Sequence, residues 1–302
     1  MTRALPNLDD LELLVQVAGS GSIGRTATAR GLSQPHASRR LSALERSLGV
    51  PLLTRSRRGT ALTPEGRVVV GWAESMLGAA DDFTRSVRTL REGRTAEISV
   101  AVSMTIAEHY APAWLARLHA RSPEVRVSLT LRNSTEVAEL VETGHADIGF
   151  IESPTVRRSL HRRRIGWDQL AVAVGPSHPW ATRRRPLSPT ELVGADLLIR
   201  EPGSGTRETL ERALHRAGLA LDGSLAMASN TALKSAAAAG LGAVVLSRLA
   251  LSAEFTTREL VEVTVEELTL RRPLSAVWRR EAPLSPAAAV LVQVAAEEPS
   301  RP

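Results

Sequence analysis

In the first 50 residues, apolar side chains recur every three or four positions in three runs, which predicts three amphipathic helices. The runs cover residues 8–18, 22–30 and 33–48. Asn7 and Ser33 are residue types that cap helix N-termini, and Gly49 is placed to end the third helix. The second and third helices are joined by a tight turn. This arrangement predicts a helix-turn-helix.

The third helix carries polar and basic side chains opposite an apolar stripe that starts at Ala37 and ends at Leu48. Hydrogen-bonding and cationic groups of this kind suit base edges and phosphates. Residues 21–60 hold eight arginines against a single acid, Glu45. A solvated charged surface is the alternative, but charge, capping and turn spacing together favour DNA binding. The candidate DNA-contacting residues are Ser33, Gln34, Pro35, His36, Ser38, Arg39 and Arg40 in the helix, and Arg55, Arg57 and Arg58 in a predicted hairpin or wing.

Residues 64–91 are predicted to form one long helix of about 42 Å, at 1.5 Å per residue. Thr63 can cap it, and Pro64 suits its first position. Apolar side chains alternate along it by three and four positions in a narrow seam. This seam consists of Val69, Trp72, Met76, Ala79, Phe83, Val87 and Leu90. Because a narrow seam is typical of helix pairing, we expect a dimer, with packing on the chain's own core as the alternative.

From residue 97 onward the pattern changes to short apolar strands that alternate with helices. This rhythm predicts a parallel sheet with helices on its faces. The expected strands cover residues 98–102, 125–131, 147–151, 170–174, 197–200, 224–228, 243–246 and 274–278. A helix is expected over residues 106–120, and the chain crosses twice between the two halves. We therefore expect two α/β lobes with a cleft between them.

Polar side chains follow the ends of these predicted strands and open the next helices. Ligands of such sheets bind at this edge, near helix N-termini, and Arg207 offers a fork for a carboxylate, sulfate or phosphate. Taken singly, such residues are usually caps, but five sets at five strand ends favour a cleft for a small anion. The candidates are Ser103, Thr105, Asn133, Ser134, Glu152, Ser204, Gly205, Thr206, Arg207, Asn230 and Thr231.

Charge and composition limit the classes of protein to which the chain can belong. The chain has 302 residues and a net charge of +6, and its first 95 residues hold 14 arginines against nine acids. Nearly all of the excess positive charge therefore lies in the predicted DNA-binding part. Cysteine is absent, which excludes disulfides, thiolate metal sites and thiol redox sensors. No signal peptide and no apolar stretch of membrane-spanning length are recognised, so we expect a cytoplasmic protein with no membrane contact.

Residues 11–66 resemble the winged helix-turn-helix of LysR-type transcriptional regulators. The motifs that carry this resemblance are Gly21-Ser22-Ile23, Leu32-Ser33-Gln34-Pro35, Leu44-Glu45, Leu48-Gly49-Val50-Pro51-Leu52 and Leu62-Thr63-Pro64-Glu65-Gly66. Ile23, Thr26 and Leu53 depart from the residues that the family often has there. The resemblance implies that Gln34, Pro35, Ser38 and Arg39 face the major groove and that the wing arginines contact the backbone. It also implies dimers, and often tetramers.

Residues 97–297 resemble the effector-binding domain of the same family, which has the fold of periplasmic solute-binding proteins, type II. The motifs are Ser103-Met104-Thr105-Ile106-Ala107-Glu108, Arg200-Glu201-Pro202-Gly203-Ser204-Gly205-Thr206-Arg207 and Ala236-Ala237-Ala238-Ala239-Gly240-Leu241-Gly242. They are most similar to the subgroup that controls sulfur assimilation or carbon fixation. The resemblance implies a small-molecule coinducer in the cleft. Met104 joins the candidate ligand-binding residues, although it is bulkier than the hydroxyl residue often found there.

The expected fold is multidomain: an all-α winged helix-turn-helix over residues 1–63, a linker helix over 64–92 and an α/β two-lobed effector domain over 93–302. Lobe I covers about residues 93–165 and 269–302, and lobe II about 166–268. The expected function is a sequence-specific transcription regulator that binds double-stranded DNA as a homodimer or homotetramer and responds to a small, anionic metabolite. The operator, the effector's identity and the sign of regulation stay open.

Other protein classes lack support in the sequence. The Gly-Ser-Gly-Ser-Ile-Gly run at residues 19–24 matches a dinucleotide fingerprint but follows a helix rather than a strand. A hydrolase or dehydrogenase would need a nucleophile–base pair or a cofactor loop, and a transport protein would need a signal peptide. We therefore expect no catalytic residue, no metal site and no cofactor. The arginine runs at 157–158, 162–164 and 183–185 are predicted to be solvated loops, with a second nucleic-acid patch as the alternative.

Overall fold

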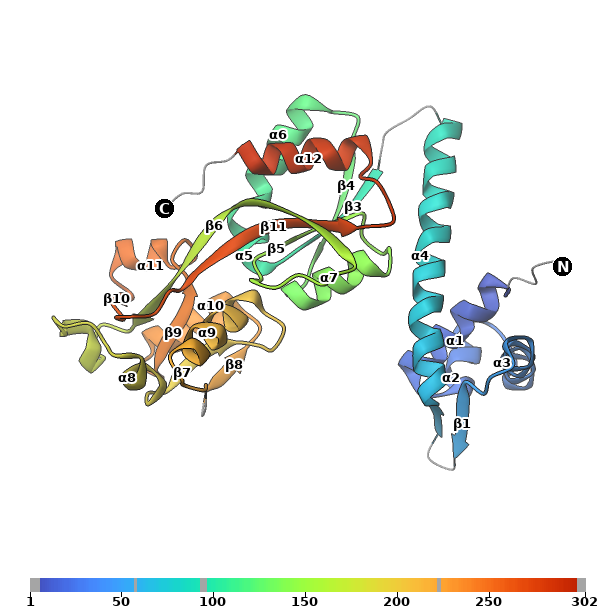
Figure 1. Cartoon of the computed structure of the whole chain (residues 1–302), viewed down its shortest axis with the longest axis horizontal. Coiled ribbons are helices and arrows are strands. Elements are labelled where there is room, and N and C mark those ends of the chain that lie inside the picture. The colour runs from blue at the N-terminus through green and yellow to red at the C-terminus, as the bar shows by residue number, and fades with distance from the viewer. Residues whose placement is uncertain (1–5, 57–58, 93–96, 222–223, 298–302) are drawn as a thin grey trace. The chain divides into compact units, whose positions relative to one another are not determined.

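The computed structural model describes residues 6–56, 59–92, 97–221 and 224–297, without the side chains of residues 55, 56, 59, 81, 82 and 85–92. Its elements fall into two compact units (Figure 1). One unit holds the helices and the hairpin of the first 94 residues, and the other holds nearly all of the remaining chain. No helix within the described ranges has both the length and the apolar character needed to cross a membrane.

The described part of the N-terminal unit contains four helices and a two-stranded hairpin. Its elements are α1 (Leu8–Ser20), α2 (Ile23–Ala29), α3 (Gln34–Leu48), β1 (Leu53–Ser56), β2 (Gly59–Leu62) and α4 (Pro64–Glu92). The Asn7 side chain accepts a hydrogen bond from the Asp9 amide at 2.8 Å, which caps α1. Apolar faces of α1, α2 and α3 meet in one core around Leu13, Leu14 and Leu41, which are almost fully buried.

The C-terminal unit is built on one continuous path of strands. They are β3 (Glu97–Val102), β4 (Arg126–Leu131), β5 (Ile148–Ile151), β6 (Leu160–Val174), β7 (Leu197–Arg200), β8 (Leu225–Met227), β9 (Ala243–Ser247), β10 (Val261–Val263) and β11 (Arg271–Arg279). Their order is β4-β3-β5-β11-β6-β9-β7-β8, and β10 pairs with β6. Strands β3, β4 and β5 are parallel, as are β7, β8 and β9. The antiparallel pair β6 and β11 connects these two groups, so they form two lobes.

Helices cover both faces of each lobe (Figure 1). Lobe I carries α5 (Met104–His109), α6 (Ala111–Arg121), α7 (Ser134–Glu142) and α12 (Pro286–Glu297). Lobe II carries η1 (Pro179–Thr182), α8 (Pro189–Val193), α9 (Gly205–Arg216), α10 (Asn230–Ala238) and α11 (Ser252–Thr257). In lobe I the rings of Trp114 and Phe150 pack with their centroids 5.1 Å apart. The expected α/β architecture with two lobes is therefore confirmed.

Two details differ from the sequence-based expectations. The single helix expected over residues 106–120 is interrupted at Tyr110, and a new helix begins at Ala111 with Pro112 in its first turn. Pro112 has no N–H for the i→i−4 hydrogen bond of a continuous helix, whereas the first turn of a new helix tolerates it. Strand β6 begins at Leu160, so the arginines at 162–164 lie in a strand and not in the expected loop. Residues 160–169 of β6 pair with β11, whereas β9 and β10 pair with β6 only from Leu170 onward. The arginines therefore lie on a local sheet edge, which tolerates charged side chains.

Candidate functional site

Helix α3 presents a polar face to solvent. The Ser33 side chain accepts a hydrogen bond from the His36 amide at 3.4 Å, and Gly49 ends the helix with a φ of 71°, in the left-handed region. Ala37, Leu41 and Leu44 are buried against the core, which turns the opposite face outward. Of the predicted DNA-contacting residues in this helix, five are exposed and Ser38 is half-buried. The exposed residues are Ser33, Gln34, Pro35, His36 and Arg39.

Among the described residues of α2 and α3 and the turn between them, two arginines form ion pairs within the protein. Arg40 is half-buried and forms an ion pair with Asp10 of α1, and Arg30 forms one with Glu12 of the same helix. Arg40 therefore joins α3 to α1, and its expected contact with DNA stays a prediction. Arg39 makes no ion pair with the described residues, so its guanidinium is available to a partner outside the chain.

The hairpin predicted after α3 is present. Strands β1 and β2 pair in antiparallel fashion, with Arg55 opposite Thr60. The Arg55 side chain and both Arg57 and Arg58 lie outside the described residues, so their contacts with DNA stay a prediction. Glu45 has a role that the sequence did not reveal: its Oε1 accepts hydrogen bonds from the Leu52 and Leu53 amides, at 2.8 and 3.1 Å, and fixes the start of the hairpin.

In the C-terminal unit, the ends of β3, β4 and β5 bring several predicted ligand-binding residues to the junction of the lobes. Ser103, Ser134 and Glu152 follow these three strands, and each is at least nine-tenths buried. The Oγ atoms of both serines and Oε2 of Glu152 have no hydrogen-bond partner among the described residues. Buried polar atoms of this kind are costly unless a partner is supplied.

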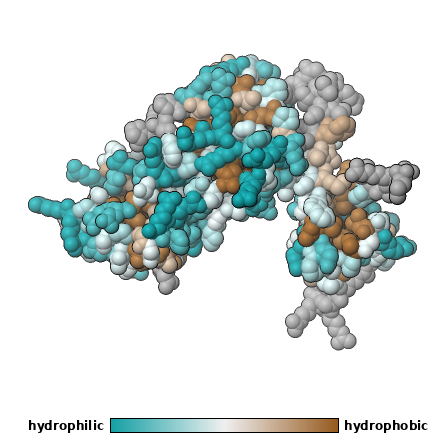
Figure 2. Space-filling view, viewed as in Figure 1, coloured by the Kyte–Doolittle hydropathy of each residue, from teal (hydrophilic) through white to brown (hydrophobic). Residues whose placement is uncertain are grey.

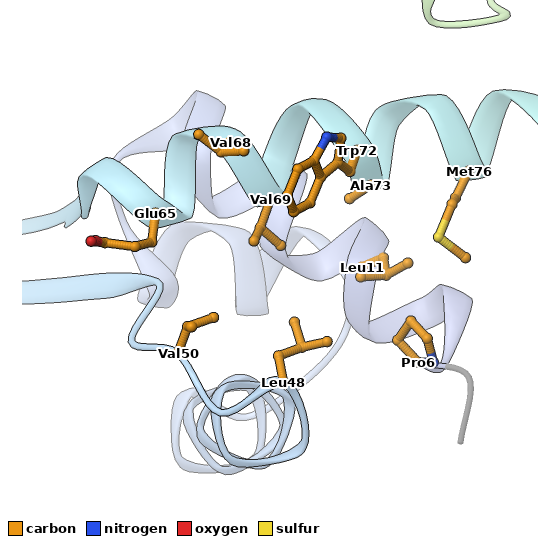
Figure 3. A pocket seen from close by; sticks show the side chains of 10 residues that line it. All are labelled: Pro6, Leu11, Leu48, Val50, Glu65, Val68, Val69, Trp72, Ala73 and Met76. Atoms are coloured by element: carbon orange, nitrogen blue, oxygen red, sulfur yellow. The ribbon is translucent and has the colours of Figure 1, made fainter. Parts of the chain in front are cut away.

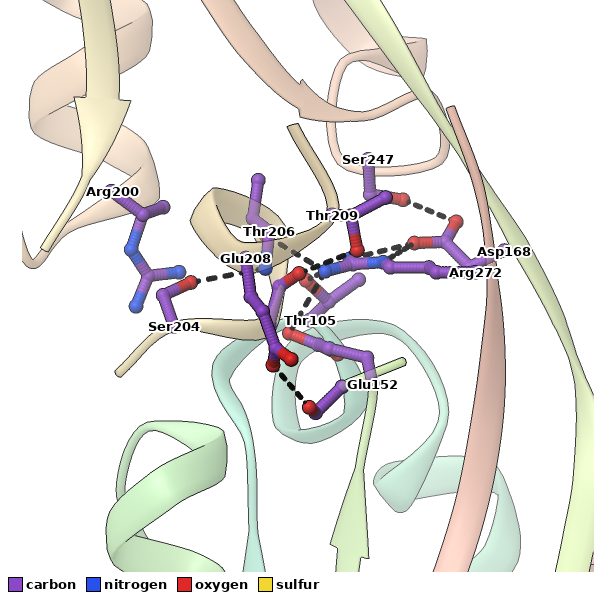
Figure 4. A network of polar contacts seen from close by, with 12 residues as sticks. Thr105, Glu152, Asp168, Arg200, Ser204, Thr206, Glu208, Thr209, Ser247 and Arg272 are labelled. Carbon is purple, nitrogen blue, oxygen red and sulfur yellow. Dashed lines mark hydrogen bonds and ion pairs between the residues drawn. The ribbon is translucent and has the colours of Figure 1, made fainter. Parts of the chain in front are cut away.

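A buried arginine holds the centre of the junction (Figure 4). Arg272 of β11 donates from Nε to Oδ2 of Asp168 on β6 at 2.7 Å, and the two residues are cross-strand partners. Its Nη1 donates to Thr206 of lobe II at 2.8 Å, and its Nη2 to Thr105 of lobe I at 3.3 Å. Its Nη1 also lies 3.7 Å from Oε1 of Glu152. One guanidinium therefore links both lobes.

The charges around Arg272 explain why it stays protonated. Burial alone would lower the pKa of Arg272, but the carboxylates of Glu152 and Asp168 outweigh this effect and raise its pKa above the ordinary value. Ser247, at the end of β9, donates to Oδ1 of Asp168 at 2.7 Å. The cluster is therefore satisfied almost entirely by the protein itself.

A second polar connection joins the lobes at Asn230, the first residue of α10. Its Nδ2 donates to Glu108 of lobe I at 2.8 Å, and its Oδ1 accepts from Nη1 of Arg200 at 2.9 Å. Arg200 is buried and also forms a bidentate pair with Glu201, with distances of 2.8 and 3.0 Å. Arg200, Glu108, Asp168 and Arg272 were not among the predicted site residues, although Arg200 begins the loop that the sequence singled out.

The N-terminus of α9 packs closely on lobe I. Ser204 caps the helix by accepting from the Thr206 amide at 3.2 Å. A side chain on Gly205 would lie 2.7 Å from the carbonyl oxygen of Glu152, so this contact requires glycine. Arg207, the predicted anion-binding fork, instead pairs with Glu211 on the same helix at 2.6 Å. A carboxylate one helical turn away therefore meets the charge of Arg207 in this structure, and its role in anion binding stays a prediction.

The remaining predicted residues have local roles or lie apart. Asn133 caps α7 by accepting from the Glu136 amide at 3.0 Å. Met104 is half-buried at the start of α5, and Thr231 is exposed on α10.

A cavity of about 290 Å³ lies at the junction, lined by residues of lobe I and by Glu208 of α9. Within the described part of the chain, no group of three or more His, Asp or Glu side chains is arranged to hold a metal ion.

Comparison with known proteins agrees with this architecture. Residues 8–67 match the family described as "Bacterial regulatory helix-turn-helix protein, lysR family". Residues 91–300 match the family described as "LysR substrate binding domain". Together these matches cover both units.

Relatives and solved structures extend the comparison to whole chains. An uncharacterized HTH-type transcriptional regulator of Mycobacterium tuberculosis, Rv2282c, is 38% identical over 290 residues, covering 92% of each chain. The transcriptional regulator CbbR of Xanthobacter flavus is 32% identical over 94% of this chain and 86% of its own. The crystal structure of CbnR in complex with its target DNA has a TM-score of 0.67 at 22% identity, covering 96% of this chain and 98% of CbnR.

The matching families and the relatives named above are transcriptional regulators rather than enzymes. The helix-turn-helix, its exposed recognition face and the two-lobed unit are the parts that such a regulator needs. The chain therefore belongs to the family of LysR-type transcriptional regulators.

Proposed function

We propose that this regulator recognises duplex DNA with the exposed face of α3 and responds to a small, anionic metabolite bound between its lobes. The observation that carries the first part is the division of α3 into a buried apolar face and an exposed face bearing Gln34, His36 and Arg39. Amide and guanidinium groups donate to base edges in the major groove. The likeness to CbnR, whose structure includes its target DNA, supports this proposal.

We also propose that the chain acts as a homodimer or homotetramer. On α4, Trp72 and Phe83 are 66% and 71% exposed, so this part of the seam is not covered by the described residues of its own chain. Beside it, a groove of about 420 Å³ is lined almost entirely by apolar side chains (Figure 3). Hydrophobic side chains also reach the surface of this unit in the space-filling view (Figure 2). A second α4 would cover such a surface, and two recognition helices would multiply affinity.

The effector proposal rests on the lobe junction. Hydroxyl groups of Ser103 and Ser134 are buried there without hydrogen-bond partners among the described residues, and the guanidinium groups of Arg200 and Arg272 lie in the same region. Hydroxyls and guanidinium groups are the usual partners of small anions. An effector changes DNA binding only as far as its affinity differs between two arrangements of the protein. We also propose that the DNA-binding domain ends at residue 63, that the linker helix covers residues 64–92 and that the effector domain begins at residue 93.

Arg39→Ala tests the recognition surface. In gel-shift titrations against the promoter region next to the chain's own gene, we expect the variant to lose about 1–3 kcal/mol of specific binding and to discriminate less between sequences. Arg46→Ala is the matched control, because Arg46 is exposed at the far end of the same helix. It should leave the ratio of specific to non-specific affinity unchanged. Wild-type specificity in Arg39→Ala would show that the α3 face is assigned wrongly.

A further inference from the structure

The cavity at the lobe junction contains a carboxylate supplied by the chain itself. Its lining comes from the start of α7, the end of β5, the segment after β5 and one residue of α9. The lining residues are Ser134, Thr135, Ala138, Ile151, Ser153, Thr155, Val156, Arg157 and Glu208. Glu208 is therefore the side chain that lobe II contributes to a cavity otherwise formed by lobe I.

Two hydroxyl groups bind this carboxylate. Ser153 donates from Oγ to Oε2 of Glu208, and Thr155 donates from Oγ1 to Oε1. The Thr155 amide in turn donates to Oγ of Ser153 at 3.1 Å, which fixes the pair in place. Among the described residues, Glu208 forms an ion pair with Arg212, 3.7 Å away on the same helix. Both side chains are about one-third exposed, so this pair is weak. Hydroxyl donors rather than a cation hold the carboxylate.

Other groups of the cavity also favour an anion. Ser134 is 3% exposed, lines the cavity, and its Oγ has no hydrogen-bond partner among the described residues. It begins α7, a helix of nine residues whose N-terminus carries partial positive charge. Asn133 already caps this helix, so the Ser134 hydroxyl is not needed for capping. Arg157 lines the cavity as well, but its charge is met by Glu142.

We infer that Glu208 occupies a subsite for a small carboxylate, sulfate or phosphate group, and that the effector's anionic group displaces it. This inference rests on the proposed function, since it assigns the anionic end of the proposed effector. The hydroxyls of Ser153, Thr155 and Ser134 then bind the incoming anion in place of Glu208.

The displacement gives the site a regulatory property. Glu208 lies in the first turn of α9, so its contacts with Ser153 and Thr155 tie lobe II to lobe I. An anion that takes these hydroxyls breaks that tie and changes the relative stability of the lobe arrangements. The internal carboxylate also competes with the effector, so the apparent affinity is lower than the subsite alone would give.

Removal of the Glu208 carboxylate should therefore uncover the subsite. Sulfate is titrated into the full chain by calorimetry, with thermal unfolding as a second readout. We expect Glu208→Ala to bind sulfate at least about tenfold more tightly than the wild type, a change of about 1.4 kcal/mol. Glu208→Gln, which keeps the volume and loses the charge, should show a smaller gain and guards against misfolding of the alanine variant.

Glu262→Ala is the matched control, because Glu262 is also a carboxylate of lobe II that pairs with an arginine, in this case Arg248, and it does not line the cavity. It should bind sulfate as the wild type does. Adding Thr155→Val or Ser134→Ala to Glu208→Ala should remove most of the gain. Sulfate affinity unchanged in Glu208→Ala, or a gain that survives both second substitutions, would overturn the inference. These titrations contain no DNA, so a negative result would leave the assignment of the α3 face to DNA binding intact. Likewise, failure of the α3 assignment in gel shifts would leave the sulfate subsite intact.

Discussion

The Arg272 guanidinium is fully buried, and its hydrogen-bond partners come from both lobes and from the neighbouring strand β6. Replacing it with methionine keeps much of its length but leaves Asp168 and Glu152 buried without a counter-charge. Removing one member of a buried ion pair usually costs about 3–5 kcal/mol. We expect Arg272→Met to lower the free energy of unfolding of the C-terminal unit by this amount, measured by urea denaturation.

Arg271→Met is the matched control for this variant. Arg271 is the preceding residue of β11, exposed, with its guanidinium 4.3 Å from the centre of the Trp167 ring. Loss of such an exposed contact costs only about 0.5–1 kcal/mol. Equal effects of the two substitutions would mean that the Asp168 and Glu152 carboxylates are stabilised by something other than Arg272.

His109 gives the molecule a predictable response to pH. Burial lowers the pKa of His109 and outweighs the opposing effect of Glu108, while Lys234 lowers it further and Asp168 and Glu152 act in the opposite direction. The unfolded chain, with a His pKa near 6.5, therefore binds this proton more readily than the folded chain. We expect the free energy of unfolding to fall as the pH drops below about 6.5 and through the lower folded pKa.

Urea denaturation at about pH 8 and about pH 5.5 measures this dependence. His109→Gln should reduce the loss of stability between the two values. His119→Gln serves as the control, because His119 is exposed on the neighbouring helix α6. If the His109 variant keeps the full pH dependence, other groups are responsible for it.

Residues whose roles are local were predictable from the sequence, and those in the Arg272 cluster were not. Ser33 and Gly49 lie beside the helix that they cap and end, so spacing alone identified them. Asp168 and Arg272 are 104 positions apart, and only the pairing of β6 with β11 brings them together. Arg207 was chosen because its guanidinium can bind an anion. In the structure this guanidinium binds the Glu211 carboxylate instead, and the sequence alone did not show which of the two partners it takes.

At the scale of elements, one side of α4 packs against the N-terminal core and another side is exposed. Its first turn packs so closely that a side chain on Gly66 would lie 2.1 Å from the Leu52 carbonyl oxygen. Gly71, on the same helix, would meet nothing within 4 Å. We expect Gly66→Ala to destabilise the N-terminal unit by about 1–3 kcal/mol through overpacking. Gly71→Ala should instead stabilise it by about 0.5–1 kcal/mol, because alanine favours a helix.

Thermal unfolding followed by circular dichroism compares these two variants directly. Because both replace glycine with alanine in one helix, their difference isolates the contact with Leu52 from helix propensity. Similar melting behaviour of Gly66→Ala and Gly71→Ala would show that the start of α4 does not need its close approach to the segment before β1.

Helices with clear caps were the elements most reliably predicted. The N-terminal helices begin at their expected caps, and the linker helix covers the predicted range to within one residue. Strand β6 is longer than the expected strand over residues 170–174. Its charged residues 161–164 do not show the apolar pattern of a strand, and their pairing with β11 depends on the backbone. Sheet order could not be derived either, since the antiparallel pair that connects the lobes is formed by strands distant in the sequence.

At the scale of the whole molecule, the exposed seam of α4 favours a second copy of the chain as its partner. Its core-facing side, which includes Ala73 and Leu77, packs against the N-terminal helices, so the side with Trp72 and Phe83 is left without a partner among the described residues. Leaving large apolar side chains in water is unfavourable, and pairing of two α4 helices would bury them. The Val87 and Leu90 side chains of the seam lie outside those described.

The double variant Trp72→Glu, Phe83→Glu tests this assembly, because it places like charges where two seams would meet. We expect a monomer by analytical ultracentrifugation and a loss of apparent operator affinity of about 10²- to 10⁴-fold, since the second recognition helix then binds independently. Leu241→Glu, at an exposed apolar residue of lobe II, should change neither. A double variant that stays dimeric and binds DNA as the wild type does would place the interface elsewhere. Monomers with full affinity would instead show that one α3 helix suffices for binding.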